Sequence, residues 1–333
     1  MIYLLFAVGL MLLIKGGDWF VDGATGIARR FHLPELLIGA TVVSIGTTLP
    51  EVMVSTTSAI QGHSQIAYGN AIGSIICNTA LIAAVSMAIR PSAVNPRNLR
   101  TPVTFFFIAA VFYAAIAYTT GYFSRPAGII LLVLFVLYII SNVMEMKDAP
   151  NGSNPAVGND AVRDDGSESD EESTDDPLWK LILLLVVGAL LIAVGADLLV
   201  DNGTLIAQAL GVPESVIALT FVALGTSLPE LVTAITSLIK GHSSLSLGNI
   251  IGANVFNLVL VCGLSMTVSP FSIPENSTLF GINASLVVDL PVMFLVMILL
   301  TSIPLVKGKT TRLQGIALLA IYAAFCMYQF TMG

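Results

Sequence analysis

Two nearly identical hexapeptides carry the residues best suited to chemistry: Gly-Thr-Thr-Leu-Pro-Glu at 46–51 and Gly-Thr-Ser-Leu-Pro-Glu at 225–230. Each lies in an apolar run long enough to cross a bilayer. A carboxylate in such a run is costly and indicates function by default. A proline there frees backbone carbonyl oxygens, which only protein or a wet cavity can satisfy. We therefore expect both hexapeptides to line a polar cavity near the middle of the membrane.

All of the candidate ligand atoms are oxygens. They are the carboxylates of Glu51 and Glu230, the hydroxyls of Thr48 and Ser227, and backbone carbonyls expected near Thr47 and Thr226. The apolar runs that follow add Ser74, Asn78 and Asn257, preceded by Asn70 and Asn249. Calcium takes about six to eight oxygen ligands, whereas zinc and copper favour His and Cys. Hard cations are therefore the expected cargo, with no cofactor.

The composition indicates what kind of protein must position these residues. Of its 333 residues, 56% are hydrophobic and 11% are charged, and the mean hydropathy is +0.89. Soluble domains carry about 25% charged residues, so we expect an all-α polytopic membrane protein embedded in the lipid bilayer. We expect no nucleic-acid partner. No H-E-x-x-H pattern or His/Cys cluster indicates an enzyme.

The apolar runs are arranged as an internal duplication. Ten runs are long enough to cross a bilayer, at 2–28, 34–60, 66–89, 102–120, 126–145, 178–207, 213–239, 245–268, 283–303 and 311–330. Adding 179 to a residue number in the first half repeatedly gives a matching residue, as it does for Asp18 and Asp197 or Glu51 and Glu230. Five spans per copy is an odd number. The sequence therefore predicts ten transmembrane helices in two inverted five-helix repeats.

Basic residues test this topology. If the N-terminus lies outside, the cytoplasmic loops and their borders hold Arg29, Arg30, Arg90, Arg97, Arg100, Lys147, Arg163, Lys180, Lys240, Lys307, Lys309 and Arg312. Only Arg125 is left for an outer loop, and Lys15 lies inside the first span. Cytoplasmic loops carry such an excess of Lys and Arg. We therefore expect a cell-membrane protein with both termini outside.

A central acidic segment separates the predicted domains. Residues 1–147 form the first repeat, 148–177 the connecting loop and 178–333 the second repeat. Ten of the 21 Asp and Glu residues lie between 148 and 176, which accounts for the net charge of −7. With so little to bury, this segment is expected to be a disordered cytoplasmic linker. A calcium sensor is the alternative, but the D-x-D-x-D-G spacing of an EF-hand loop is missing.

Paired carboxylates favour exchange over leakage. Together they balance one divalent or two monovalent cations, whereas the empty pair carries uncompensated charge in a medium of low dielectric constant. One cargo must therefore replace another before the protein switches sides, which defines an antiporter. Protons also neutralise such a pair, so proton coupling stays open. A cation channel is less favoured, because channels more naturally use rings of identical subunits.

The paired motifs resemble those of a known family. GTTLPE with GNAIGSIICN, and GTSLPE with GNIIGANVFN, are similar to the two alpha repeats of the cation/calcium exchanger superfamily, especially the prokaryotic sodium/calcium exchangers. The resemblance covers nearly the whole chain. It implies adjacent sodium and calcium sites lined by Glu51, Thr47, Thr48, Ser74, Asn78, Glu230, Thr226 and Ser227. It also implies alternating access by sliding of the first and sixth helices. We expect a monomer to be functional.

Two positions depart from that family. Well-studied sodium/calcium exchangers of this type carry Asp where this chain has Asn257 and Ser where it has Ala253. One carboxylate and one hydroxyl are therefore missing. The coupling ion stays open between sodium, protons, and sodium accompanied by potassium.

Other features receive structural interpretations. Solvation at a helix end or at the membrane interface is expected for four acidic residues: Asp18, Asp22, Asp197 and Asp201. His63 and His242 are expected in turns at the headgroup level. The G-x-x-x-G patterns at 69–73 and 248–252 are expected to bring helices close together.

Overall fold

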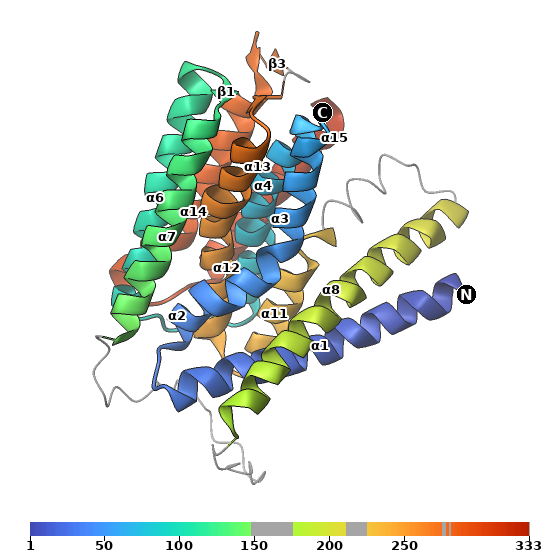
Figure 1. Ribbon diagram of the computed structural model, residues 1–333, viewed down its shortest axis with the longest axis vertical. Helices are drawn as coiled ribbons and strands as arrows, with labels where there is room; N and C mark the ends of the chain where they lie inside the picture. The colour runs from blue at the N-terminus through green and yellow to red at the C-terminus, as the bar shows by residue number, and fades with distance from the viewer. Residues whose placement is uncertain (148–175, 211–224, 275–277, 280, 333) are drawn as a thin grey trace.

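The computed structural model describes residues 1–147, 176–210, 225–274, 278–279 and 281–332. This part of the chain is almost entirely helical (Figure 1). Eight of its helices are long and apolar enough to cross a membrane: Ile2–Arg30, Glu35–Ile60, Ser64–Ile89, Pro96–Thr119, Arg125–Met146, Leu178–Ile206, Ser243–Val268 and Ser285–Lys307. The expected class, an all-helical multi-pass membrane protein, is confirmed.

Two of the ten predicted spans are not among these eight helices. The seventh, 213–239, is represented by α11 (Leu228–Ile239), because residues 211–224 lie outside the described part of the chain. The tenth, 311–330, corresponds to α15 (Arg312–Met332), a helix of 21 residues. The predicted linker also lies outside the described residues, apart from Asp176 and Pro177.

The two halves share part of their succession of elements. The first contains α1 (Ile2–Arg30), α2 (Glu35–Ile38), η1 (Gly39–Val43), α3 (Ser44–Ile60), α4 (Ser64–Cys77), η2 (Asn78–Ala83), α5 (Ala84–Ile89), α6 (Pro96–Thr119), β1 (Tyr122–Phe123) and α7 (Arg125–Lys147), where η marks a π-helical segment. The second contains α8 (Leu178–Ala209), α11, α12 (Ser243–Phe256), η4 (Asn257–Cys262), α13 (Gly263–Val268), β2 (Phe271–Ser272), β3 (Thr278–Leu279), β4 (Ile282–Asn283), η5 (Ser285–Asp289), α14 (Leu290–Lys307) and α15. The bounds of α4, η2 and α5 recur 179 residues later in α12, η4 and α13.

The π-helical segments η2 and η4 begin at equivalent residues, Asn78 and Asn257. A π-helical turn accommodates one more residue than an α-helical turn, and such turns are frequent at functional sites. Both asparagines are predicted ligands. The local backbone is therefore irregular where the sequence places chemistry.

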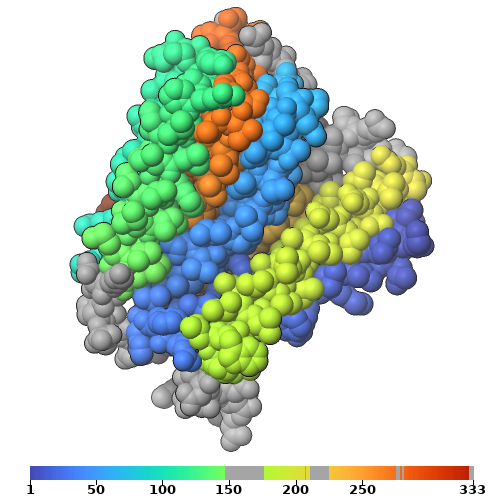
Figure 2. All heavy atoms as spheres, viewed as in Figure 1, coloured from blue at the N-terminus to red at the C-terminus, as the bar shows by residue number. Residues whose placement is uncertain are grey.

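Helices α1 and α8 form a long antiparallel pair that crosses the other helices obliquely (Figure 1). Glycines let their backbones touch, because a Cβ at Gly16 would lie 2.8 Å from the amide nitrogen of Ile192 and one at Gly195 would lie 2.8 Å from the carbonyl oxygen of Gly9. Small residues allow such close approach of membrane helices. The two helices lie side by side along one edge of the molecule (Figure 2). They therefore pack as one unit.

The remaining helices surround α4 and α12. In the most apolar part of Ser243–Val268, 83% of the residues are buried, against 28% for Leu178–Ile206. Helix α12 packs against α2, η1 and α11. Helix α12, which carries Asn249 and leads into Asn257, thus belongs to the most buried of the eight spans.

Short strands connect the helices at their ends. Strand β1 pairs antiparallel with β2, and β3 with β4. The β1–β2 pair joins the connection between α6 and α7 to the segment after α13. It therefore holds the two halves together at one end of the bundle.

Candidate ion-binding site

The two hexapeptides differ in backbone structure. Helix α3 continues through Pro50, so the proline of the first hexapeptide does not end its helix. A proline inside a membrane helix need not end it, because neighbouring helices and local adjustments satisfy the freed groups. In the second hexapeptide Thr226 and Ser227 form a turn, and α11 begins at Leu228 with Pro229 in its first turn. A proline is well tolerated at that position of a helix.

Glu51 and Glu230 are both completely buried. The hydroxyl of Thr48 donates a hydrogen bond of 3.5 Å to Oε1 of Glu230, across the two halves. Within the described part of the chain, both carboxylate oxygens of Glu51 and Oε2 of Glu230 have no hydrogen-bond partner. A buried polar atom without a partner costs free energy, so these oxygens are available to a cation.

Equivalent threonines bind equivalent asparagines of the opposite half. The hydroxyl of Thr47 donates to Oδ1 of Asn249 at 3.2 Å, and that of Thr226 donates to Oδ1 of Asn70 at 3.1 Å. Each residue of one bond lies 179 positions from its counterpart in the other. We call these two contacts the crosswise bonds. They fix the backbone of each hexapeptide against the other half.

The two asparagines differ in their amide nitrogens. Nδ2 of Asn70 donates to Oγ of Ser55 at 2.8 Å and to the carbonyl oxygen of Glu51 at 3.3 Å. Nδ2 of Asn249 has no partner among the described residues. The position equivalent to Ser55 holds Ala234, which cannot accept a hydrogen bond. The side-chain amide nitrogen of Asn249 is therefore less well satisfied than that of Asn70.

The other predicted ligands are also buried. The hydroxyl of Ser227 donates to Oγ of Ser74 at 3.5 Å, again between the halves. Asn78 and Asn257 are fully buried, and neither side-chain amide has a hydrogen-bond partner in the described ranges. The structure therefore brings Ser74 and Ser227 together. The side-chain oxygens of Asn78 and Asn257 are free among the described residues, and neither asparagine forms a hydrogen bond with the carboxylates.

Sequence reasoning missed Ser44. This residue is fully buried, and its hydroxyl lies 2.7 Å from the carbonyl oxygen of Gly39 and 2.9 Å from that of Asn249, both acceptors. It thereby joins α3 to α12 beside the site. Its position three residues before Thr47 places both on one helix face, a signal the sequence already contained.

The α1–α8 pair covers the site. A cavity of about 10 Å³, enough for about one water molecule, lies between Phe20 of α1, Ala189 of α8, and Thr47, Pro50 and Pro229 of the hexapeptides. The α1–α8 pair therefore packs over both hexapeptides. No cluster of three or more His, Cys, Asp or Glu residues occurs in the described part of the chain.

Comparison with known proteins identifies the family. The family model described as sodium/calcium exchanger protein matches residues 1–144 and 180–331. The chain belongs to the sodium/calcium exchanger family. It is 31% identical to the sodium/calcium exchanger MaX1 of Methanosarcina acetivorans, with 98% of both chains covered. It is also 36% identical to inner membrane protein YrbG of Escherichia coli over 80% of this chain and 79% of that one.

The fold agrees with a solved member of this exchanger family. A structure of the sodium-calcium exchanger NCX_Mj, soaked with Na⁺ and Sr²⁺, has a TM-score of 0.79 and 31% identity, and all of both chains is covered. The resemblance to prokaryotic sodium/calcium exchangers is therefore confirmed. The chain is a multi-pass membrane transporter and not an enzyme.

The close helix packing predicted for the two G-x-x-x-G patterns is present at the second pattern, 248–252. A Cβ at Gly252 would lie 2.6 Å from Cα of Ala40, and one at Gly248 would overlap the carbonyl oxygen of Leu36. For Gly69 and Gly73, no atom of the described residues lies within 4 Å of an added Cβ. The residue equivalent to Leu36 is number 215, which lies outside the described ranges.

Proposed function

We propose that this protein exchanges Ca²⁺ for Na⁺ across the cell membrane by alternating access, with Glu51 and Glu230 as the central ligands. The observation that supports this most is the burial of both carboxylates with three oxygens unpartnered among the described residues. Two such groups match the charge of one calcium ion. The remaining ligands in this proposal are Thr47, Thr48, Ser74, Asn78, Thr226, Ser227 and Asn257.

The same electrostatics supports obligatory exchange. A pair of buried anions without a cation is strongly unfavourable in a medium of low dielectric constant. Transition between the two access states is therefore slow while the site is empty. Calcium leaves on one side only when sodium takes its place.

The proposed architecture is ten spans in two inverted repeats, 1–147 and 178–333, joined by the segment 148–177. Helices α1 and α8 support inversion, because they hold equivalent positions in the two halves and run antiparallel. The asymmetry of Lys and Arg places the termini outside and the joining segment in the cytoplasm. Both carboxylates come from one chain, which supports a functional monomer.

Flux measurements on purified protein in liposomes test this function. Calcium uptake is expected only when sodium is present inside the vesicles, and collapse of the sodium gradient should stop it. Parallel experiments with a proton gradient or with added potassium test the alternative couplings. Calcium flux that needs no counter-ion would indicate a channel and would contradict the proposal.

The neutral side chain of Asn257 supports the alternative couplings, in which protons replace sodium or potassium accompanies it. The resemblance implies a carboxylate at this position. Asn257 is fully buried in η4. Asn257→Asp is expected to add a charged ligand and to raise the Hill coefficient for sodium, with calcium affinity changed by less than about threefold. Asn257→Ser, which stays neutral, is the control and should keep the wild-type coefficient. Identical sodium Hill coefficients in Asn257→Asp and the wild type would count against a role in coupling.

A further inference from the structure

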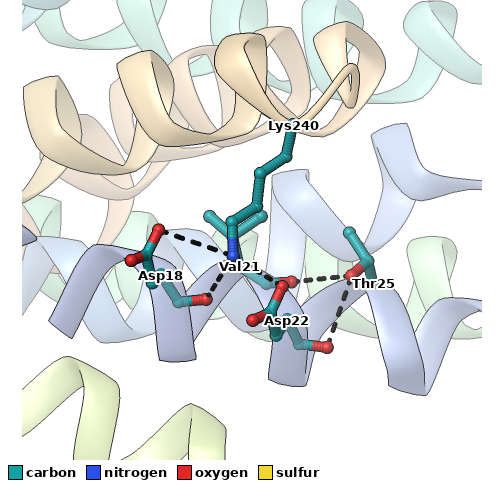
Figure 3. A network of polar contacts seen from close by, with 5 residues as sticks. All are labelled: Asp18, Val21, Asp22, Thr25 and Lys240. Carbon is teal, nitrogen blue, oxygen red and sulfur yellow. Dashed lines mark hydrogen bonds and ion pairs between the residues drawn. The ribbon is translucent and has the colours of Figure 1, made fainter. Parts of the chain in front are cut away.

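Lys240 connects the end of α11 to α1. It directly follows Ile239, the last residue of α11. Its Nζ lies 2.7 Å from Oδ1 of Asp22, 3.5 Å from Oδ1 of Asp18 and 3.1 Å from the carbonyl oxygen of Asp18 (Figure 3). An ammonium group has three hydrogens to donate. The three oxygens of α1 therefore match its donors.

Close helix packing accompanies these contacts. A Cβ at Gly17 would lie 2.7 Å from Cγ1 of Val232 and 2.8 Å from the hydroxyl of Thr236, both on α11. A larger residue at this position would force α1 away from α11. The ion pairs and the glycine thus both hold the two helices together at the Lys240 end.

The other half lacks both features. At the interval of 179 residues, Asp197 and Asp201 on α8 correspond to Asp18 and Asp22, but Gln61 corresponds to Lys240 and Ala196 to Gly17. Among the described residues, no ion pair is formed by Asp197 or Asp201. Helix α1 is therefore attached to its neighbour by ion pairs, whereas in the described part of the chain the equivalent helix α8 is not.

We infer that Lys240, Asp18 and Asp22 form a one-sided latch, which stabilises the conformation closed at the Lys240 end and thereby biases the two access states. This inference rests on the proposed alternating access. The Lys240 end also carries Arg29 and Arg30, which the distribution of basic residues assigns to the cytoplasm. The favoured state therefore opens toward the outside.

The exposure of the latch limits its strength. The side chain of Lys240 is 25% exposed, and those of Asp18 and Asp22 are 38% and 51% exposed. Partly exposed ion pairs are screened by salt and contribute little individually. Removal of the charge on Lys240 is expected to lower the ratio of closed to open states by about two- to fivefold. The latch thus shifts an equilibrium and leaves both states accessible.

Spin labels on the two helices measure this ratio. Arg29→Cys and Ile239→Cys place labels on exposed positions of α1 and α11. Cys77 and Cys262 are buried and stay in place, whereas the half-buried Cys326 is replaced by alanine. Distance distributions from double electron-electron resonance in lipid nanodiscs then give the populations closed and open at this end.

Four variants of the labelled protein test the latch. Lys240→Gln should enlarge the long-distance population, because it removes the latch. Gln61→Lys should also enlarge this population. The new lysine creates an equivalent contact with Asp197 and Asp201, which favours the state that is open at the Lys240 end. Lys240→Arg and the control Lys307→Gln should leave the populations unchanged. Choline chloride at about 1 M, where the Debye length is about 3 Å, should erase the difference between the wild type and Lys240→Gln.

The outcomes separate this inference from the proposed function. An unchanged closed-to-open ratio in Lys240→Gln overturns the latch, even when coupled calcium flux is intact. A shift of equal size in Lys307→Gln overturns it as well. Absence of coupled flux in the wild type rejects the exchange function, whereas a shifted ratio in Lys240→Gln then still supports the latch.

Discussion

Replacement of Glu51 by glutamine is expected to reduce calcium flux by about 100-fold or more. Glu51 is fully buried, and neither of its carboxylate oxygens has a hydrogen-bond partner among the described residues. Removal of one member of a buried charge pair costs about 3–5 kcal/mol, which corresponds to more than two decades in affinity. The amide keeps the shape of the side chain, so the protein should fold. Calcium uptake into sodium-loaded liposomes, with thermal unfolding in detergent, measures both properties.

Glu230→Gln should have the same effect, because the two carboxylates share one site in the proposal. Glu35→Gln is the matched control. Glu35 lies at the start of α2, where its Oε1 is 2.8 Å from Nδ1 of His242, and a glutamine there can keep the hydrogen bond. Near-normal calcium flux in either site variant would remove the basis of the assignment.

Gly16→Val is expected to destabilise the fold and to lower transport by about tenfold or more. A Cβ at this position would lie 2.8 Å from the amide nitrogen of Ile192 and 2.9 Å from the carbonyl oxygen of Gly188. Both atoms belong to the backbone of α8, so they cannot move aside as a side chain would. Overpacking of this kind costs about 1–3 kcal/mol. Melting temperature and sodium-driven calcium flux measure the two consequences.

Ile14→Val is the control for this change. Ile14 is on the same helix, but 58% of its surface is exposed. Its substitution should alter neither stability nor flux. Gly195→Val, on the opposite helix, should reproduce the effect of Gly16→Val because its Cβ would meet the backbone of α1. A wild-type melting temperature in both glycine variants would show that α1 and α8 tolerate separation.

Hydropathy locates the spans because a bilayer demands about 20 apolar residues in each helix. It does not define their ends. The run predicted at 283–303 contains Asp289 and Pro291, and there the chain forms the π-helical segment η5 before α14. The π-helical segments at Asn78 and Asn257 are equally invisible in the pattern, because they depend on packing within the bundle.

The site could be predicted as a list of residues but not as a set of contacts. Glu51 directly follows a proline and Thr48 lies two residues before it, both in a repeated hexapeptide, which marks them from the sequence alone. The contact between Thr48 and Glu230 joins residues 182 positions apart. Such pairings depend on how the two halves meet, and no local pattern encodes that.

Long-range contacts also give peripheral residues partners that the sequence did not predict. Asp18 and Asp22 were expected to be solvated, and both are partly exposed, but they also bind Lys240 from the other half. His242 was expected in a turn at the headgroup level. It directly precedes α12, and its ring lies against Glu35 of α2.

The crosswise bonds have a consequence for fragments of the chain. Thr47 finds its acceptor on Asn249, and Asn70 receives its bond from Thr226. A polypeptide that ends at 147 lacks both partners, and one that begins at 178 lacks them in turn. Neither fragment expressed by itself completes the cavity, whereas co-expression of the two should restore it by complementation.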